Sequence, residues 1–298
     1  MHILVSGSSG LIGGELTRRL ERGGHSVTRL IRRAPAGGHE VFWDPKAGRL
    51  EPSALKGVDA VIHLAGENVA AGRWSSQRKG EIRESRVAST RILAERLSAL
   101  DAPPGVLIAA SAIGFYGDSG EAERTESSGA GSGFLAEVCR AWEAACEPAS
   151  RRGIRVANLR FGLVVTPDGG ALARMVPAFK IGLGGRLGDG RQWMSWVTLD
   201  DAIGAIEWVL EDDDLRGPLN VVSPSPVRQA EFAATLGRVL HRPTLLPMPA
   251  SVLRFLLGEM ADELLLASTR AVPRTLIERR YRFRHPQLEP ALRSLLSG

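Results

Sequence analysis

Short apolar runs alternate with segments of helical periodicity along the first half of the chain. The apolar runs predict strands at residues 2–6, 25–31, 39–43, 58–66, 105–111 and 153–162. The helical spacing predicts helices at residues 11–24, 77–100 and 133–143. Strands separated by helices of this length form a parallel sheet with helices on both faces, and right-handed crossovers leave one topology. The pattern predicts an α/β protein with a doubly wound, Rossmann-like parallel sheet.

The alternation of predicted strands and helices ends after Val165. Residues 166–195 are rich in glycine and predict loops with one helix. Residues 196–212 predict a short strand and a helix capped by Asp200 or Asp201, and the tail from about Pro226 is mostly helical. We expect a dinucleotide-binding domain of residues 1–166 and 196–222. A smaller, mostly helical substrate domain of residues 167–195 and 223–298 should cover the carboxyl edge of the sheet.

A glycine-rich turn joins the first strand to the first helix, with Gly7, Gly10 and Gly13 in the spacing GxxGxxG. In a dinucleotide fold these glycines permit a tight turn, let the backbone approach a pyrophosphate, and let helix and sheet pack closely. The free N–H groups at the helix start attract the diphosphate. A plain strand-turn-helix that needs glycines is the alternative. We favour a cofactor site that comprises Gly7, Ser9, Gly10, Leu11, Ile12 and Gly13.

The end of the second predicted strand indicates which dinucleotide binds. An Asp or Glu there would accept a hydrogen bond from the ribose 2′-hydroxyl of NAD, but the chain has Arg32 and Arg33 and no carboxylate. Guanidinium groups fit a 2′-phosphate, which a carboxylate would repel. Two solvated arginines are the alternative interpretation, but the pattern favours NADP(H) as the cofactor.

Composition excludes several classes of protein. The chain has 298 residues, 44% of them hydrophobic, which is enough for a sizeable core. No apolar stretch is long enough to span a membrane, and the N-terminus has the pattern of a strand rather than a signal peptide. We therefore expect a cytoplasmic protein with no membrane partner. The net charge is +5, but the arginines are spread along the chain, so we expect no nucleic-acid partner.

Two smaller features concern cysteine and arginine. Cys139 and Cys146 lie seven residues apart in one predicted helix without a metal-ligand spacing, so we expect two reduced core thiols and no metal. A basic cluster near the C-terminus is either a solvated edge or an anion contact, and it comprises Arg279, Arg280, Arg282 and Arg284.

Longer motifs follow one another along the chain. They are HLAGENV (63–69), RW (73–74), SRVAST (85–90), SAIGFYGD (111–118), FLAEVCRAWE (134–143), RFGLVV (160–165), GLGGRLGDGRQWMSWVTLDD (182–201) and PLNVVSP (218–224). With them the chain resembles an extended short-chain dehydrogenase/reductase and, more narrowly, the epimerase family within that superfamily. Members of that family are labelled nucleoside-diphosphate-sugar epimerases or cell-division inhibitors. The resemblance covers nearly the whole chain.

The resemblance implies roles for residues that spacing does not reveal. The backbone of Leu64, Ala65 and Gly66 should pass under the adenosine phosphates and ribose. Further cofactor contacts are expected from the start of the long helix and from the ends of the fifth and sixth strands, namely from Glu81, Arg86, Ser111 and Val164. The substrate pocket is expected to include Glu67, Asn68, Arg186, Arg191 and Trp193. A solvated charge pattern for Glu81 and a packed Trp193 are the alternatives.

The catalytic residues of the superfamily are absent. Extended reductases and epimerases carry a Ser four residues before the Tyr of a Tyr-Gly pair, and a Tyr-x-x-x-Lys on the next helix. That Tyr is the acid/base, and the Lys lowers its pKa and holds the nicotinamide ribose. Here the tyrosine of the pair is Tyr116, so Ala112 occupies the Ser position. Aligning Glu143 with the acid that ends the motif places Leu135 and Cys139 at the Tyr and Lys positions.

Other groups would have to supply the chemistry. Tyr116 is the best substitute acid, because it follows the fifth strand at the carboxyl edge of the sheet. A turn tyrosine that packs on the lid is the alternative interpretation. His63 and Glu67 are further titratable candidates, although a histidine on a strand is more often a core residue with satisfied hydrogen bonds.

The sequence leads to two hypotheses of different classes. The leading one is an NADP(H)-binding oxidoreductase or epimerase that acts through a non-standard site on a small-molecule substrate, which can be anionic. The alternative is a non-catalytic, NADPH-bound regulatory or scaffold protein linked to cell division. It is motivated by a glycine-rich phosphate loop that is intact while the catalytic Ser, Tyr and Lys are absent.

Overall fold

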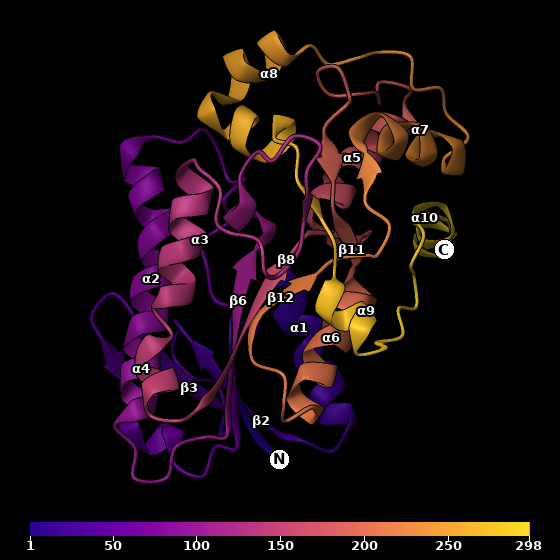
Figure 1. The fold of residues 1–298 in the computed structure, drawn as a ribbon. Coiled ribbons are helices and arrows are strands. Elements are labelled where there is room, and N and C mark those ends of the chain that lie inside the picture. The colour runs from indigo at the N-terminus through magenta and orange to yellow at the C-terminus, as the bar shows by residue number, and fades with distance from the viewer. Residues whose placement is uncertain (298) are drawn as a thin grey trace.

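An eight-stranded sheet forms the centre of the protein, whose computed structural model describes residues 1–297 (Figure 1). Its strands lie in the order β12-β8-β6-β5-β1-β2-β3-β4, and every neighbouring pair is parallel except β3 and β4. The strands are β1 (His2–Ser6), β2 (Ser26–Ile31), β3 (Glu40–Asp44), β4 (Arg49–Leu50), β5 (Ala60–His63), β6 (Val106–Ala112), β8 (Arg155–Phe161) and β12 (Gly217–Val221). The strand order reverses between β1 and β5, where doubly wound sheets hold their ligands.

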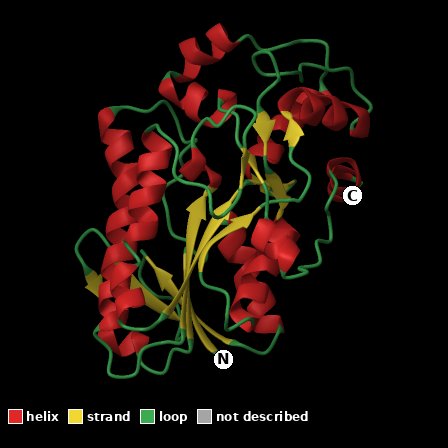
Figure 2. Cartoon of the chain, viewed as in Figure 1, coloured by secondary structure: helices red, strands yellow, loops and turns green. Residues whose placement is uncertain are grey.

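Helices cover both faces of this sheet (Figures 1 and 2). On one face lie α1 (Leu11–Arg22) and α6 (Leu199–Glu211), and on the other lie α2 (Ser76–Ser98), α3 (Phe134–Ala144) and α4 (Glu147–Arg151). The predicted fold class is therefore confirmed. Among residues 1–297, none of the helices combines the length and the apolar character needed to cross a bilayer.

Side-chain alternation along the strands divides the apolar residues between two cores. In β1, Ile3 and Val5 belong to the core that contains Leu16 of α1 and Ile206 of α6. Leu4, between them, belongs to the other core, together with Trp43, Leu93 and Leu97. Both faces of β1 are therefore buried, which is why its sequence is continuously apolar instead of alternating.

A second unit lies beyond the carboxyl ends of the strands, in the direction in which the arrows of β6 and β8 point (Figure 1). Phe179, Trp196, Phe232, Leu236 and Leu292 belong to a core of its own. Its helices are α5 (Gly170–Lys180), α7 (Gln229–Val239), α8 (Ala250–Leu257), the π-helix η3 (Ala261–Leu266) and α10 (Leu288–Leu296). α9 (Arg274–Glu278) instead packs on β12, and its Leu276 belongs to the core that contains α1 and α6. Three short strand pairs lie outside the central sheet: β9 (Leu163–Thr166) with β11 (Trp196–Thr198), β10 (Trp193–Met194) with β13 (Val227–Arg228), and β7 (Glu123–Arg124) with β14 (Arg270–Ala271).

Two local expectations were wrong. α6 is capped by Thr198 and not by Asp200 or Asp201, because the Thr198 hydroxyl accepts a hydrogen bond from the Asp201 N–H at 3.1 Å. Cys139 and Cys146 do not share one helix, because α3 ends at Ala144 and α4 begins at Glu147. The next residue of α4 is a proline, which has no N–H to continue the helical ladder. Both thiols are free and buried, as expected.

A buried carboxylate fastens the C-terminal segment to α6. Asp201 is 2% exposed. One of its oxygens accepts from the backbone N–H of Arg284 at 2.7 Å, and the other accepts from the N–H of His285 at 2.9 Å and from the Thr198 hydroxyl at 3.0 Å. Three donors therefore converge on one side chain, which compensates for its removal from water.

We expect Asp201→Ala to lower the free energy of unfolding by about 2–4 kcal/mol, because it leaves buried N–H groups without acceptors. Urea denaturation measures this change. Asp213→Ala is the control, because that side chain is fully exposed near the end of the same helix, and its effect should stay within about 0.5 kcal/mol. Equal effects of the two substitutions would contradict the anchoring role of Asp201.

Candidate functional site

The turn after β1 is shaped by close backbone contacts. Gly7 has a φ of +73°, and a Cβ atom there would lie 2.7 Å from the carbonyl carbon of Leu64. A Cβ atom on Gly13 would lie 2.2 Å from the carbonyl oxygen of Gly7. Side chains at either position would push the turn, the helix and the end of β5 apart. The glycines therefore bring three backbone segments together at the switch point of the sheet.

The N-terminus of α1 is open for an anion. Its N-cap is Gly10, which has no side chain to accept from the first N–H groups, and the first turn holds no acidic residue. Ser9 and Gly10 are exposed, whereas Leu11 and Ile12 are partly buried. Unpaired N–H groups and the positive end of the helix dipole together form an anion-binding site.

Arg32 and Arg33 follow β2 and differ in their partners. Arg33 forms two hydrogen bonds to the carboxylate of Glu40, which hold the pKa of that carboxyl below its usual range. Arg32 has one contact, 3.1 Å from Nη1 to Oε1 of Glu67, and its side chain is 72% exposed. Glu67 follows β5, so this pair spans the end of β1. Arg32 is the more accessible of the two guanidinium groups.

The segment after β5 lies directly over the glycine turn. A Cβ atom at Gly7 would also lie 2.8 Å from the backbone nitrogen of Ala65, so Leu64 and Ala65 border the turn, and Gly66 is exposed. Asn68 forms a local turn by accepting from the N–H of Ala70 at 2.9 Å.

Glu81 and Arg86 both lie on α2, but their hydrogen-bond partners differ in kind. Glu81 accepts hydrogen bonds from Gln77 and Arg78, which lower the pKa of its carboxyl, and this arrangement favours the solvated charge pattern. Arg86 is partly buried, and its Nη2 donates to the carbonyl of Glu67 at 2.9 Å.

Leu135 and Cys139 face the end of β6. A Cβ atom on Gly114 would lie 3.3 Å from Cβ of Leu135 and 3.8 Å from Sγ of Cys139. Burial raises the pKa of the Cys139 thiol to about 12, so it remains protonated at neutral pH. Both residues therefore pack against the turn that follows β6. Neither a leucine nor a neutral thiol can supply the acid or the cation that the alignment predicts for the superfamily at these positions.

A buried polar network lies near Cys139. Arg160 donates from Nε to Oε1 of Glu143 at 2.7 Å, from Nη2 to Oε2 at 2.8 Å, and from Nη1 to the Tyr116 hydroxyl at 2.9 Å. Ser111 donates to Glu143 at 2.7 Å, and Tyr116 donates to Asn220 at 2.7 Å. The network links α3, β6, β8, β12 and the turn after β6.

This network uses two of the predicted site residues. Tyr116 is 1% exposed, and burial raises the pKa of its phenol. It packs with Val222 and Ala271. This environment favours the alternative interpretation, a turn tyrosine that packs on the lid, because a sealed hydroxyl is not available to a substrate. Ser111 is 3% exposed and its hydroxyl is directed to Glu143, so it is not presented to a cofactor.

Sequence reasoning missed the partners of Tyr116. The signal was present in strand 155–161, where Arg160 interrupts an apolar run. A charged side chain inside a buried strand requires a buried partner of opposite charge. Glu143 of the predicted helix 133–143 is a candidate for that partner.

The predicted cofactor contact Val164 and the predicted pocket residues Arg186 and Arg191 lie on separate segments beyond β8. Val164 pairs with Val197 between β9 and β11 and is partly buried. Arg186 and Arg191 are exposed.

Trp193 is packed, as its alternative interpretation held. The guanidinium carbons of Arg228 and Arg270 lie over its ring, 4.1 and 4.7 Å from the ring centre. Its Nε1 donates to Glu121 at 3.1 Å. Hydrogen bonds from Arg228 and Trp193 lower the pKa of that carboxyl to about 2.

The second unit contacts α3 directly. The carboxylate of Glu263 accepts from the backbone N–H groups of Phe134 at 2.9 Å and Leu135 at 3.1 Å. Lys79 pairs with Glu259 at 2.8 Å. Glu263, a residue of the second unit, therefore caps the N-terminus of α3, the helix that carries Leu135 and Cys139. No pattern in the sequence predicted this contact.

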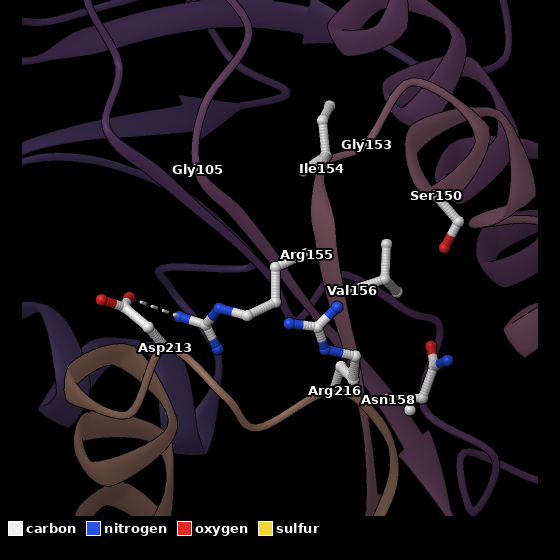
Figure 3. A pocket seen from close by; sticks show the side chains of 10 residues that line it. Gly105, Ser150, Gly153, Ile154, Arg155, Val156, Asn158, Asp213 and Arg216 are labelled. Carbon is white, nitrogen blue, oxygen red and sulfur yellow. Dashed lines mark ion pairs between the residues drawn. The ribbon is translucent and has the colours of Figure 1, made fainter.

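A surface cavity of about 430 Å³ lies at the opposite, amino edge of the sheet (Figure 3). Arg155 points into it and donates to the carbonyls of Val209 at 3.0 Å and Leu215 at 2.9 Å, near the end of α6. Arg216 also lines it, and Asp213 lies 3.8 Å from Arg155. Arg155 neutralises the carboxyl end of α6, which explains its position without a ligand.

Two further expectations concern ions. In the C-terminal cluster, Arg279 pairs with Asp212 and Arg284 pairs with Asp200, both at 2.9 Å, which favours a solvated edge. Over residues 1–297, the structure contains no group of three or more His, Cys, Asp or Glu side chains arranged to hold a metal ion.

Comparison with known proteins identifies the family. The model of the NAD dependent epimerase/dehydratase family matches residues 3–222. The chain belongs to this family. A second model, a domain of unknown function (DUF1731), matches residues 248–295, which contain α8, α9 and all but the last residue of α10.

Relatives in this family cover the whole chain. The epimerase family protein Mb2239 of Mycobacterium bovis is 44% identical over 97% of this chain and 96% of its own. The structure of human epimerase family protein SDR39U1 with NADPH superposes with a TM-score of 0.93, at 32% identity and 100% coverage of both chains. A nucleoside-diphosphate sugar epimerase from Corynebacterium glutamicum gives a TM-score of 0.81 at 36% identity, over 99% of this chain and 58% of that one. The predicted family is confirmed.

His63 is a core residue. Its Nδ1 lies 2.6 Å from the Ser6 hydroxyl and its Nε2 lies 3.3 Å from the Ser89 hydroxyl. Burial lowers the pKa of its ring from 6.5 to about 4, so it is neutral at physiological pH. Both nitrogens are satisfied, which favours the core interpretation over a catalytic one.

The pKa of His63 predicts a loss of stability in acid. Between pH 6.5 and about 4 the unfolded chain binds a proton at His63 that the folded chain does not, so stability falls as the pH falls. The full difference is about 3 kcal/mol. Urea denaturation at pH 7 and pH 5 should show a steeper loss in the wild type than in His63→Gln, which cannot titrate. The same slope in both proteins would exclude this contribution.

Tyr116→Phe should destabilise the fold without weakening cofactor binding. It leaves Nη1 of Arg160 and the amide oxygen of Asn220 without their partner, at a cost of about 1–3 kcal/mol. Thermal denaturation and NADPH titration measure the two effects. Tyr281→Phe is the matched control, since it removes a single hydrogen bond to a backbone carbonyl, and its effect should be smaller. A loss of NADPH affinity in Tyr116→Phe would contradict this structural role and indicate that Tyr116 takes part in the cofactor site.

Proposed function

We propose that the protein binds NADP(H) across the carboxyl ends of β2, β1 and β5. The open N-terminus of α1 below the glycine turn carries this proposal, because it offers N–H groups to a diphosphate and lacks any competing side-chain cap. The accessible guanidinium of Arg32 would take the 2′-phosphate. The NADPH in human SDR39U1, 32% identical over the full length, supports the same cofactor.

The function that follows is that of an NADP(H)-dependent oxidoreductase or epimerase with a non-standard site, acting on a small-molecule substrate. Hydride transfer needs the nicotinamide and a bound acceptor. It does not need a tyrosine if the proton comes from water. The exposed Arg186 and Arg191 would favour an anionic substrate.

One observation favours a second candidate, a cofactor-bound regulator without catalysis. Leu135 and Cys139, which pack against the turn after β6, provide no group that titrates near neutral pH, because burial raises the pKa of the Cys139 thiol to about 12. Tyr116 and His63, the nearest alternatives from the sequence, have polar atoms that are used inside the protein. A regulator would need the cofactor to change the protein, and the Glu263 cap on α3 links the site to the lid.

Two measurements separate these candidates. Oxidation of bound NADPH in a single turnover, with a panel of carbonyl compounds and nucleotide sugars, supports an enzyme. Hydrogen exchange with and without NADPH tests the regulator. Slower exchange in α8 and residues 261–266 on binding supports it, and an unchanged lid contradicts it.

Cofactor choice gives a sharper prediction. We expect NADPH to bind at least tenfold more tightly than NADH, and Arg32→Ala to remove most of this difference, because a guanidinium–phosphate contact contributes about 1.5–3 kcal/mol. Isothermal titration calorimetry measures both affinities. Arg33→Ala is the control and should have a smaller effect, because that guanidinium is already paired with Glu40. Equal affinity of the wild type for NADH and NADPH would refute the assignment.

A further inference from the structure

The cavity at the amino edge of the sheet lies on the opposite side of the strands from the proposed cofactor site. Its volume is about 430 Å³, and it lies where β8 and β12 begin, beside the connection that follows α6 (Figure 3). Ile154 and Val156 form part of its wall, and Arg155, Arg216 and Asn158 contribute polar groups. Small-molecule sites have volumes of about 300–1,000 Å³, so the cavity has room for a small ligand.

The end of α6 uses only part of the guanidinium of Arg155. This side chain is 9% exposed, and only its Nη1 donates hydrogen bonds, to the carbonyls of Val209 and Leu215. The closest carboxylate in the described chain is that of Asp213, which lies 3.8 Å from Nη2 and is fully exposed to solvent. Burial lowers the pKa of Arg155, and the charge of Arg216 acts in the same direction. A buried cation therefore lies near a second cation without a close counter-charge.

Two further donors line the same cavity. Within residues 1–297, the exposed side chain of Arg216 forms no hydrogen bond and no ion pair. Asn158 is 9% exposed, and its Oδ1 accepts from the Cys146 thiol at 3.5 Å, whereas its Nδ2 has no acceptor among these residues. The lining therefore offers N–H donors and two positive charges against one solvent-exposed carboxylate, that of Asp213.

We propose that this cavity binds a small organic phosphate, with its phosphoryl group between Arg155 and Arg216. A phosphate monoester carries nearly two negative charges at neutral pH, which match the two guanidinium groups, whereas a monocarboxylate would neutralise only one of them. Asn158 adds a neutral donor, and Ile154 and Val156 offer an apolar wall to the organic part. This site does not depend on the NADP(H) site, because the two lie at opposite edges of the sheet.

Calorimetric titration with inorganic phosphate and with glycerol 3-phosphate tests the proposal. We expect Arg216→Gln to weaken binding of both ligands at least fivefold. Asp213→Asn should strengthen binding at least twofold, because it removes the carboxylate that competes for Arg155. Arg282→Gln is the matched control and should change neither affinity, because it removes the charge of another exposed arginine that does not line the cavity. The affinities should be the same with and without NADPH.

Nuclear magnetic resonance locates the bound phosphate. The backbone amide signals of Gly105, Gly153 and Gly217, which line the cavity, should shift when phosphate is added. Shifts confined to residues 7–13 would place the phosphate at the glycine turn and overturn the proposal. Absence of saturable binding, or equal affinity of the wild type and Arg216→Gln, would also overturn it.

The two substituted side chains are exposed, and thermal denaturation checks that each variant folds. If Arg216→Gln does not fold, the sign of the effect of Asp213→Asn decides. Only a phosphate bound beside Arg155 gains affinity when this carboxylate loses its charge. An unchanged or weaker affinity in Asp213→Asn would then refute the site.

Discussion

The turn after β1 can approach the end of β5 only because residue 7 has no side chain. A Cβ atom there would lie 2.7 Å from the backbone of Leu64, in a left-handed conformation that other residues rarely adopt. Gly13 allows α1 an equally close approach to the carbonyl of Gly7. These contacts place the open N-terminus of α1 at the one point where the strand order reverses, and the proposed cofactor site depends on them.

Polar side chains near the carboxyl edge divide into two groups. Those bonded to one another across secondary-structure elements stabilise the fold: Arg160 with Glu143 and Tyr116, and His63 with Ser6. Burial of such groups is tolerated because each donor meets an acceptor. Arg32, by contrast, has a single partner, Glu67, and its exposed guanidinium keeps donors for a ligand.

The lid takes part in the site through the backbone of α3. Glu263 supplies the carboxylate that caps this helix, and helix N-termini favour negative charge. Leu135 donates one of these N–H groups and also faces the end of β6. Any movement of the second unit away from α3 would leave these N–H groups without their acceptor.

The sequence by itself determined the fold class, the glycine turn, the arginines after β2 and the loss of the triad. These depend on periodicity, on spacing within one segment and on residue identity, which are local properties. Tertiary structure decided the rest. In the folded chain the Tyr116 hydroxyl is buried and hydrogen-bonded to Arg160 and Asn220. Arg33 is paired with Glu40, whereas Arg32 stays accessible. Glu263 caps the N-terminus of α3. Each of these contacts joins residues far apart in the chain or on different elements. Which polar groups meet is fixed only when the packed elements bring them within hydrogen-bonding distance.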